Sequence, residues 1–295
     1  MIGKLVELTL NRKILNRHFL NSVNFSHTMG LPLKNVVESL NGFANLKLAA
    51  SWDNVGLLIE PTEPKDISHI LLTNDLTEDV MQEAVDIKTD LILSYHPPIF
   101  SPLKSLTTRT WKERIAAKCL ENKIALYSPH TSFDSVVGGV NDWLATAFNL
   151  ESSSPIEPGL SDPRTGFGRF CILKEAITVE EAVNIVKMRT ELSHVRLACK
   201  RGSNSDDCIK TVALCAGSGT SVFKSSPPAD LYLTGEMFHH DILDLIHKGG
   251  NVILTNHSDS ERGYLKEFSK KLTELLGNSV KVEISLKDKD PLTTV

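Results

Sequence analysis

Short apolar runs that end in a polar side chain recur along this chain. Each run has the length of a buried strand, and a histidine or glutamate stands where the strand would end. Four runs follow this pattern: Asp90–His96, Ile124–His130, Ala229–Glu236 and Asn251–His257. In open α/β sheets, ligands bind in the crevice outside the carboxyl ends of the strands. The pattern therefore predicts that these polar side chains form one cluster. We interpret this cluster first as a metal site.

Apolar residues at helical spacing fill most of the intervals between these runs. One predicted helix begins at Pro32 and another follows the Thr178-Val-Glu-Glu181 capping box. Five more are predicted over residues 77–86, 110–122, 140–148, 240–248 and 260–276. Further strands are predicted within residues 51–60, 67–73, 168–173, 194–199 and 210–215. This alternation predicts an α/β fold in which helices cover the sheets.

A segment rich in serine, proline and glycine, residues 151–163, interrupts the alternation and is the best candidate for a linker. We therefore predict a first α/β half over residues 31–150 and a second over residues 164–295. Each half contributes two of the four polar strand ends. If the halves face each other, the metal site lies between them.

Residues 1–30 differ from the rest of the chain because they are basic and nearly free of acids, with Glu7 as the one carboxylate. Leucines and isoleucines alternate with the basic residues in this segment. Two interpretations stay open: a poorly ordered N-terminal extension and a mitochondrial targeting segment.

Composition narrows the classes of protein. The 295 residues are 41% hydrophobic and 23% charged, as in ordinary globular domains. The formal net charge of −4 provides no overall basic field, so we expect no direct binding to nucleic acid. No apolar run reaches the length of a membrane span, so we expect no membrane association. The five cysteines form no C-x-x-C pair, which favours free thiols and a cytoplasmic location over disulfides or a thiolate zinc site.

Two of the strand ends carry a carboxylate four residues after a histidine. Asp134 follows His130, and Glu261 follows His257. On one helical turn, both members of such a pair face the same side. Imidazole and carboxylate groups are typical ligands of divalent metals, so both pairs are candidate metal ligands.

Helix capping is the alternative role for both carboxylates. Asp134 would cap the helix that begins near Gly138, and Glu261 would close a capping box with Ser258. The parallel arrangement of the two histidine–carboxylate pairs favours the metal.

The remaining strand ends supply a third ligand and supporting groups. Two prolines follow His96, so its strand ends there and the imidazole lies at the mouth of the sheet. Glu236 and His240 are four residues apart and are interpreted as groups that support the metal ligands or contact a substrate. Gly217 and Gly219 follow another predicted strand, where a tight turn is favoured over a phosphate-binding loop.

Five ordered motifs resemble a known family. They are Ser51-Trp-Asp-Asn-Val-Gly56, Tyr95-His-Pro97, His130-Thr-Ser-Phe-Asp134 with Gly138-Gly-Val-Asn141, Gly235-Glu236 with His239-His240, and His257-Ser-Asp-Ser-Glu261. Together they resemble the Ngg-interacting-factor-3-like (Nif3-like) family, also called GTP cyclohydrolase I type 2 homologues, and in particular its animal branch. The resemblance covers residues 31–295.

The resemblance implies two intertwined α/β units with mixed sheets and the metal site between them, at the carboxyl ends of strands. It implies a homohexameric ring with a site for one or two divalent ions per chain. Histidine and carboxylate ligands fit zinc, iron, manganese or nickel alike. Carried onto this sequence, the implied metal ligands are His96, Asp134, His257 and Glu261, with His130 close by.

One residue departs from the family pattern. Bacterial members carry His-His where this chain has Tyr95-His96, and a protonated phenol is a poor metal ligand at neutral pH. The departure therefore predicts a second metal site that is weaker, holds a different ion or is empty. Tyr95 and Asp53, which lies in the first motif, are assigned to the surroundings of the metal or to substrate contact.

Two functions follow from these residues. In the first, the chain is a metal-dependent hydrolase of nucleotides or phosphoesters, in which Glu261 bridges the ions and His130 or Glu236 moves protons. In the second, it is a transcriptional corepressor or scaffold that binds a co-regulator protein and uses the metal structurally. The first is compatible with cytoplasm or mitochondria, and the second requires the nucleus.

Overall fold

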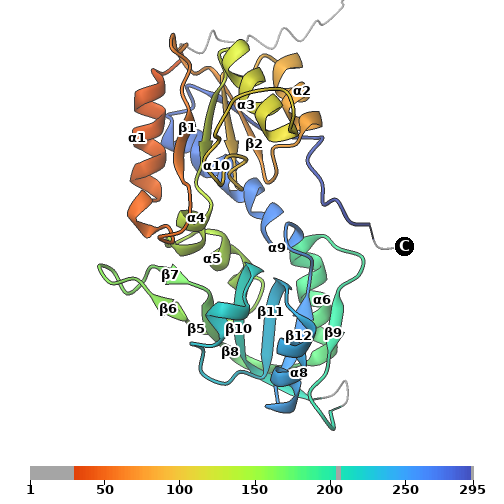
Figure 1. Cartoon of the computed structure of the whole chain (residues 1–295). Helices are drawn as coiled ribbons and strands as arrows, with labels where there is room; N and C mark the ends of the chain where they lie inside the picture. Colours follow the sequence, from red (N-terminus) through yellow and green to blue (C-terminus); the bar gives the residue numbers. More distant parts are fainter. Residues whose placement is uncertain (1–29, 204–206, 294–295) are drawn as a thin grey trace, which may run out of the picture.

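Two mixed sheets surrounded by helices make up the computed structural model of this chain, which describes residues 30–203 and 207–293 (Figure 1). The predictions made for the N-terminal 29 residues lie outside this part of the chain. Within it, no helix has both the length and the apolar character that a membrane crossing requires.

The described helices vary from single turns to three turns, and several begin as the sequence predicts. Their bounds are α1 (Leu33–Phe43), η1 (Leu46–Leu48), α2 (Glu78–Asp86), α3 (Trp111–Glu121), α4 (Thr131–Ser135), α5 (Val140–Ala145), α6 (Val179–Thr190), α7 (Thr220–Phe223), α8 (His239–His247), α9 (Asp259–Arg262) and α10 (Tyr264–Leu275). The predicted capping box is present at α6, where Thr178 and Glu181 each accept from the other's backbone N–H.

The first sheet has the strand order β1-β4-β3-β2-β13. Its strands are β1 (Gly56–Ile59), β2 (His69–Thr73), β3 (Leu91–Ser94), β4 (Ala125–Ser128) and β13 (Lys281–Ile284). All run parallel except β1, which pairs antiparallel with β4. β2, β3 and β4 are buried throughout, which explains their uninterrupted apolar sequences.

Helices cover both faces of the first sheet. α2 and α3 pack on one face against Leu71, Ile92 and Leu126. α1 and α10 pack on the opposite face against Leu72 and Leu93. Successive side chains of each strand therefore point to opposite faces of the sheet and pack against different helices.

The second sheet has the strand order β5-β8-β10-β11-β12-β9. Its strands are β5 (Leu150–Ser154), β8 (Arg169–Thr178), β9 (Arg196–Ala198), β10 (Cys208–Ser218), β11 (Leu231–Glu236) and β12 (Asn251–Leu254). The central β10, β11 and β12 are parallel, and the outer strands pair antiparallel. The prediction of α/β units with mixed sheets is thus confirmed.

The two sheets exchange elements along the chain. After β12, the chain leaves the second sheet through α9 and α10 (Figure 1). It then forms β13, which joins the edge of the first sheet beside β2. In the other direction, α5 from the first half contacts β8 and β10 of the second sheet. One continuous core cluster contains side chains of both sheets, including Leu72, Leu93, Val212 and Leu233. This exchange of elements agrees with the predicted intertwined arrangement of the two α/β units.

The structure differs from the sequence prediction at three places. Residues 151–154 of the expected linker lie in β5, and Glu157–Pro158 pairs with Gly166–Phe167 in a small hairpin (β6 and β7). The residues of β5 and β6 are largely polar and exposed. They show no apolar pattern that predicts a strand, and only backbone pairing makes them one. The strand β13 was not predicted. Finally, the helix expected over residues 260–276 is interrupted at Gly263, where an added Cβ would clash with the ring of Trp143. The division of the chain into two halves stays a prediction.

Candidate metal centre

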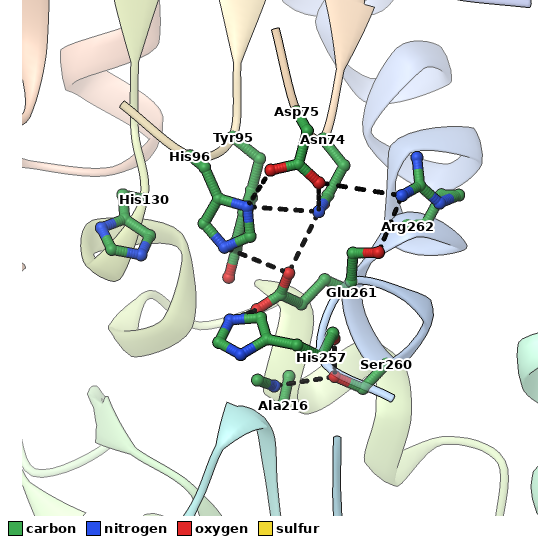
Figure 2. Close-up of polar contacts among 12 residues, drawn as sticks. Asn74, Asp75, Tyr95, His96, His130, Ala216, His257, Ser260, Glu261 and Arg262 are labelled. Carbon is green, nitrogen blue, oxygen red and sulfur yellow. Dashed lines mark hydrogen bonds and ion pairs between the residues drawn. The ribbon is translucent and has the colours of Figure 1, made fainter. Parts of the chain in front are cut away.

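Three ligand-type side chains meet where the two sheets approach each other (Figure 2). His96 follows β3, His257 follows β12, and Glu261 lies on the short helix α9. One donor atom from each of these residues lies within 4.8 Å of the others. The sheet edges thus bring together residues that are 161 positions apart (257 − 96), as expected for side chains at strand ends.

Glu261 joins the two imidazoles. Its Oε2 lies 3.4 Å from Nε2 of His96, and its Oε1 lies 3.4 Å from Nε2 of His257. The Asn74 amide donates a hydrogen bond to Oε2 at 3.2 Å. Because Glu261 is only 4% exposed, its charge requires compensation by these neighbours.

A second carboxylate holds each imidazole from behind. Nδ1 of His96 lies 2.9 Å from Oδ1 of Asp75, and Nδ1 of His257 lies 2.9 Å from Oε1 of Glu236. These contacts fix the ring orientations and leave both Nε2 atoms directed toward Glu261. A carboxylate behind an imidazole is the usual arrangement around a histidine that ligates a metal.

The pKa values of the three groups depend on one another. Burial alone would lower the pKa of His96, but the charge of Glu261 and the bond to Asp75 outweigh it and raise that pKa to about 11. Burial would also lower the pKa of His257, while Glu261 and Glu236 raise it to about 9. Burial would raise the pKa of Glu261, but both imidazolium charges hold it far below its usual range. The concentrated negative charge thus attracts cations, whether protons or a metal.

Asn74 and Asp75 also contact the centre, although no sequence pattern predicted them there. They follow β2, so they occupy the same type of strand end as the predicted ligands, but without a histidine or glutamate to draw attention to them. Asp288 accepts hydrogen bonds from both backbone N–H groups and also pairs with Arg262. The C-terminal segment after β13 therefore holds this strand end in place.

Asp134 lies beside the cluster but is engaged by Tyr95. The Tyr95 phenol donates a hydrogen bond to Oδ1 of Asp134. Burial raises the pKa of Asp134 to about 6, although the bond from Tyr95 opposes the rise. Burial and the charges of Asp134 and Glu261 raise the pKa of Tyr95 well above its usual value, so its phenol is a donor and not a metal-binding phenolate.

His130 stands next to the cluster with its own carboxylate. Its ring centroid is 5.2 Å from that of His96, and its Nδ1 lies 2.8 Å from Oδ1 of Asp53. Asp53 also accepts from the backbone N–H and the hydroxyl of Thr131. His130 has a positive φ of 32°, which is uncommon for a residue with a side chain. The role of His130 in chemistry stays a prediction.

Neither Glu261 nor Asp134 caps a helix in the way that the alternative interpretation expects. Ser258 makes no side-chain cap on α9 and instead donates to Asp290, so Glu261 is free to face the imidazoles. The helix α5 begins without a side-chain cap, and the backbone N–H of Gly138 just before it donates to Asp142. Asp134 therefore does not serve that helix.

Gly217 forms the floor of the centre. A Cβ at this position would lie 2.6 Å from Oε1 of Glu261 and 3.1 Å from Nε2 of His257, and its φ is +66°. The Gly217 N–H donates to Ser260, and the Gly219 N–H donates to Thr234. Both N–H groups therefore have protein partners, which agrees with a tight turn and not with a phosphate-binding loop. The backbone instead leaves room for a small ion between the donors.

His240 lies apart from these contacts. It is exposed in the first turn of α8, where its ring centroid is 5.3 Å from that of His239. Its predicted role stays a prediction.

The donor set fits a divalent metal. Two imidazole nitrogens and a carboxylate are held by Asp75, Glu236 and Asn74 around a space that a methyl group would fill. Borderline ions such as zinc, iron, manganese and nickel accept such ligands, and the donors do not choose among them.

Two cavities open at this centre, and both are lined by His96 and His257. One has a volume of about 570 Å³ and continues past His130 and Asp134. The other has a volume of about 620 Å³ and continues toward the C-terminal segment. Both volumes suit a small-molecule ligand.

Comparisons with known proteins agree with one another. The family model described as Duf34/NIF3 (NGG1p interacting factor 3) matches residues 31–291. The chain is 49% identical over 268 residues to NIF3-like protein 1 of Drosophila melanogaster, with 90% of each chain covered. It is 39% identical over 279 residues to NGG1-interacting factor 3 of Saccharomyces cerevisiae, covering 88% of this chain and 96% of that protein.

A solved structure has the same fold. The Bacillus cereus protein related to NIF3 superposes with a TM-score of 0.80 at 22% identity, covering 89% of this chain and 98% of that one. The likeness therefore extends over the whole arrangement of the two sheets.

Proposed function

Because this chain belongs to the Duf34/NIF3 family, as its sequence motifs indicated, we propose that it is a metal-dependent hydrolase of a nucleotide or phosphoester. The observation that supports the proposal is the position of Glu261 between two imidazoles, each backed by a carboxylate. Such a preorganised donor set, with a buried carboxylate and two half-buried imidazoles beside two cavities, is typical of a catalytic metal site.

In this proposal His96, His257 and Glu261 hold one ion. A bound divalent ion would supply Lewis acidity and lower the pKa of a neighbouring water. Asp134 accepts the Tyr95 phenol through one oxygen, and this phenol offers no nitrogen donor that would complete a second set of ligands beside Asp134. We therefore propose one ion per chain in the resting protein.

His130 is the proposed proton-transfer group. Asp53 fixes its Nδ1, and its ring lies between Trp52 and His96 at the edge of the 570 Å³ cavity. A histidine oriented in this way can accept or return a proton at its free nitrogen. Glu236, the other candidate for proton transfer, holds His257, so we assign it the orienting role.

Two measurements test this function together. Elemental analysis of the protein, purified without chelator, should find about one metal ion per chain, because the described residues contain one three-donor set. The metal-loaded protein should hydrolyse at least one member of a panel of nucleotides and phosphoesters, and Glu261→Gln should abolish that turnover. Absence of turnover across the panel, or equal turnover by Glu261→Gln, would contradict the proposal.

A non-enzymatic role is the second candidate. The name of the Saccharomyces cerevisiae relative, NGG1-interacting factor 3, describes a protein that binds a partner, and the Tyr95–Asp134 bond reduces the ligands available for a second ion. In this alternative the chain is a corepressor or scaffold that binds a transcriptional co-regulator. Partner capture that is unchanged in His96→Ala and Glu261→Ala, in a protein without turnover, would favour this role.

Assembly and compartment belong to the same proposal. We propose a homohexamer, which native mass spectrometry of the full chain would show as a six-fold mass. We also propose a cytoplasmic location for the hydrolase. A fluorescent fusion at the C-terminus separates it from the mitochondrial location that residues 1–30 suggest and from the nuclear location that a corepressor requires.

A further inference from the structure

A row of rings leads from the protein surface to the metal centre. Trp52 lies with its ring centroid 6.0 Å from that of Phe100 and 6.1 Å from that of His130. His130 is in turn 5.2 Å from His96. Trp52 is 64% exposed and Phe100 is 43% exposed. Two large aromatic side chains thus stand uncovered beside the candidate ligands.

The turn that carries Trp52 is anchored on both sides. The Ala50 N–H donates to Thr131 at 2.9 Å, and Asp53 binds His130 and Thr131. The Asn54 amide donates to the carbonyl of Ile99, next to Phe100. Trp52 is therefore held in a fixed place relative to both Phe100 and His130, and its exposure does not result from a loose loop. Prearranged aromatic side chains of this kind lower the entropic cost of binding a ring.

Both aromatic residues line the 570 Å³ cavity. The same cavity is also lined by His96, His257 and Glu261 and by the polar side chains of Glu157, Ser218 and Ser221. Aromatic side chains, polar side chains and a candidate metal centre in one cavity can recognise a planar ligand that carries polar atoms on its edge.

We propose that this cavity binds a planar heteroaromatic ring, such as a nucleobase, against Trp52 and Phe100. Every heteroaromatic ring offers a face for stacking, and its edge nitrogens and oxygens match the serine and glutamate side chains that line the cavity. The group attached to the ring then points inward toward His96 and His257. Only this last step rests on the proposed hydrolase function, because ring binding itself needs no turnover.

The second cavity offers a rival position for the ring. It contains Trp111, which is 43% exposed, together with Lys287 and Lys289. Because both cavities meet at His96 and His257, a ligand could reach the metal centre from either side. Among the described residues, no other aromatic ring pairs with Trp111, whereas Trp52 pairs with the exposed ring of Phe100. We therefore assign the heteroaromatic ring to the Trp52 side.

Binding of two related probes tests the assignment. Adenosine 5′-monophosphate and ribose 5-phosphate share the sugar and phosphate and differ in the ring. On the metal-loaded full chain, calorimetry should give an affinity for the nucleotide at least about 10-fold higher, the size of one base–aromatic stack. Trp52→Ala should remove this difference, and Trp52→Phe should keep most of it. Trp111→Ala is the matched control and should change neither affinity.

The outcomes separate ring binding from hydrolysis. Equal affinities for the two probes, no binding of the nucleotide at millimolar concentration, or loss of the difference in Trp111→Ala would overturn the proposal. The proposal would also be overturned if Trp52→Ala changed only the mass of the assembly and neither affinity, because Trp52 would then be a contact between subunits. A ring preference without any turnover would leave ring binding standing and contradict the hydrolase. Turnover of phosphoesters with no ring preference would support the hydrolase and contradict ring binding.

Discussion

The phenol of Tyr95 donates a hydrogen bond to the carboxylate of Asp134 at the side of the candidate metal centre. Tyr95 is buried and Asp134 is half-buried, and the bond joins the end of β3 to α4. Asp134 is thereby engaged by a neighbour, while His96, His257 and Glu261 converge on each other. We expect this contact to influence the number of ions that the candidate centre holds.

Replacing Tyr95 by histidine should raise the metal content from about one to about two ions per chain. The new imidazole would release Asp134 and add a donor beside it, which completes a second set of ligands. Elemental analysis after dialysis against the metal measures the change. Tyr95→Phe is the control: it also releases Asp134 but adds no donor, so it should stay near one ion. A content of one in Tyr95→His would show that Asp134 is not a metal ligand.

Glu261→Gln should lower metal affinity by more than about 100-fold, because it removes the charge that both imidazoles face while keeping the shape of the side chain. Competition with a fluorescent zinc chelator measures the affinity. Glu283→Gln is a matched control, since Glu283 also contacts a histidine, with its Oε2 2.6 Å from Nε2 of His69, but outside the centre. Similar affinities in the two variants would contradict the proposed ligand set.

Gly217→Ala should prevent metal binding while the fold persists. The added methyl group would lie 2.6 Å from Oε1 of Glu261, where an ion would need space. Gly277→Ala separates this effect from backbone strain, because its φ of +61° is similar and its nearest neighbour, Ser279, is 3.9 Å away. Both variants should lose roughly 1–2 kcal/mol of stability in urea unfolding, but only Gly217→Ala should lose the metal. Full metal content in Gly217→Ala would place the ion elsewhere.

Metal binding should release about two protons per ion at pH 7, because the pKa values of His96 and His257 are raised to about 11 and about 9 without the ion. Affinity should therefore rise with pH. For the metal-free fold the sign is opposite: these protons stabilise it below the usual histidine pKa of 6.5, and the stabilisation is lost as pH rises through 9 and then 11. Calorimetry in buffers of different ionisation enthalpy counts the protons. Binding without proton release would contradict the charge coupling.

Asp75→Asn should lower metal affinity by about 10- to 100-fold, the usual effect of losing the carboxylate behind a ligating histidine. Asp53→Asn makes the same change behind His130, which we place outside the ligand set. It should leave metal affinity nearly unchanged and reduce turnover. If Asp53→Asn weakens the metal as much as Asp75→Asn does, His130 belongs among the ligands.

Much of the fold could be predicted from local patterns. The buried parallel strands β2, β3 and β4 appear as apolar runs because both faces of the sheet are covered. The helix after Thr178 follows from a capping box that acts within one turn. By contrast, β5 and β13 lie at sheet edges, where pairing with a distant strand defines the element and the local sequence says little.

The sequence by itself determined which strand ends carry metal-type side chains, because strand length and the stop after it are local properties. Only the tertiary structure decided how these side chains are paired. Asp75 supports His96, Glu236 supports His257, and Tyr95 engages Asp134, since each pair depends on strand order and on the way the two sheets face each other. The same packing brings the backbone of Gly217 against Glu261, a contact that no spacing along the chain encodes.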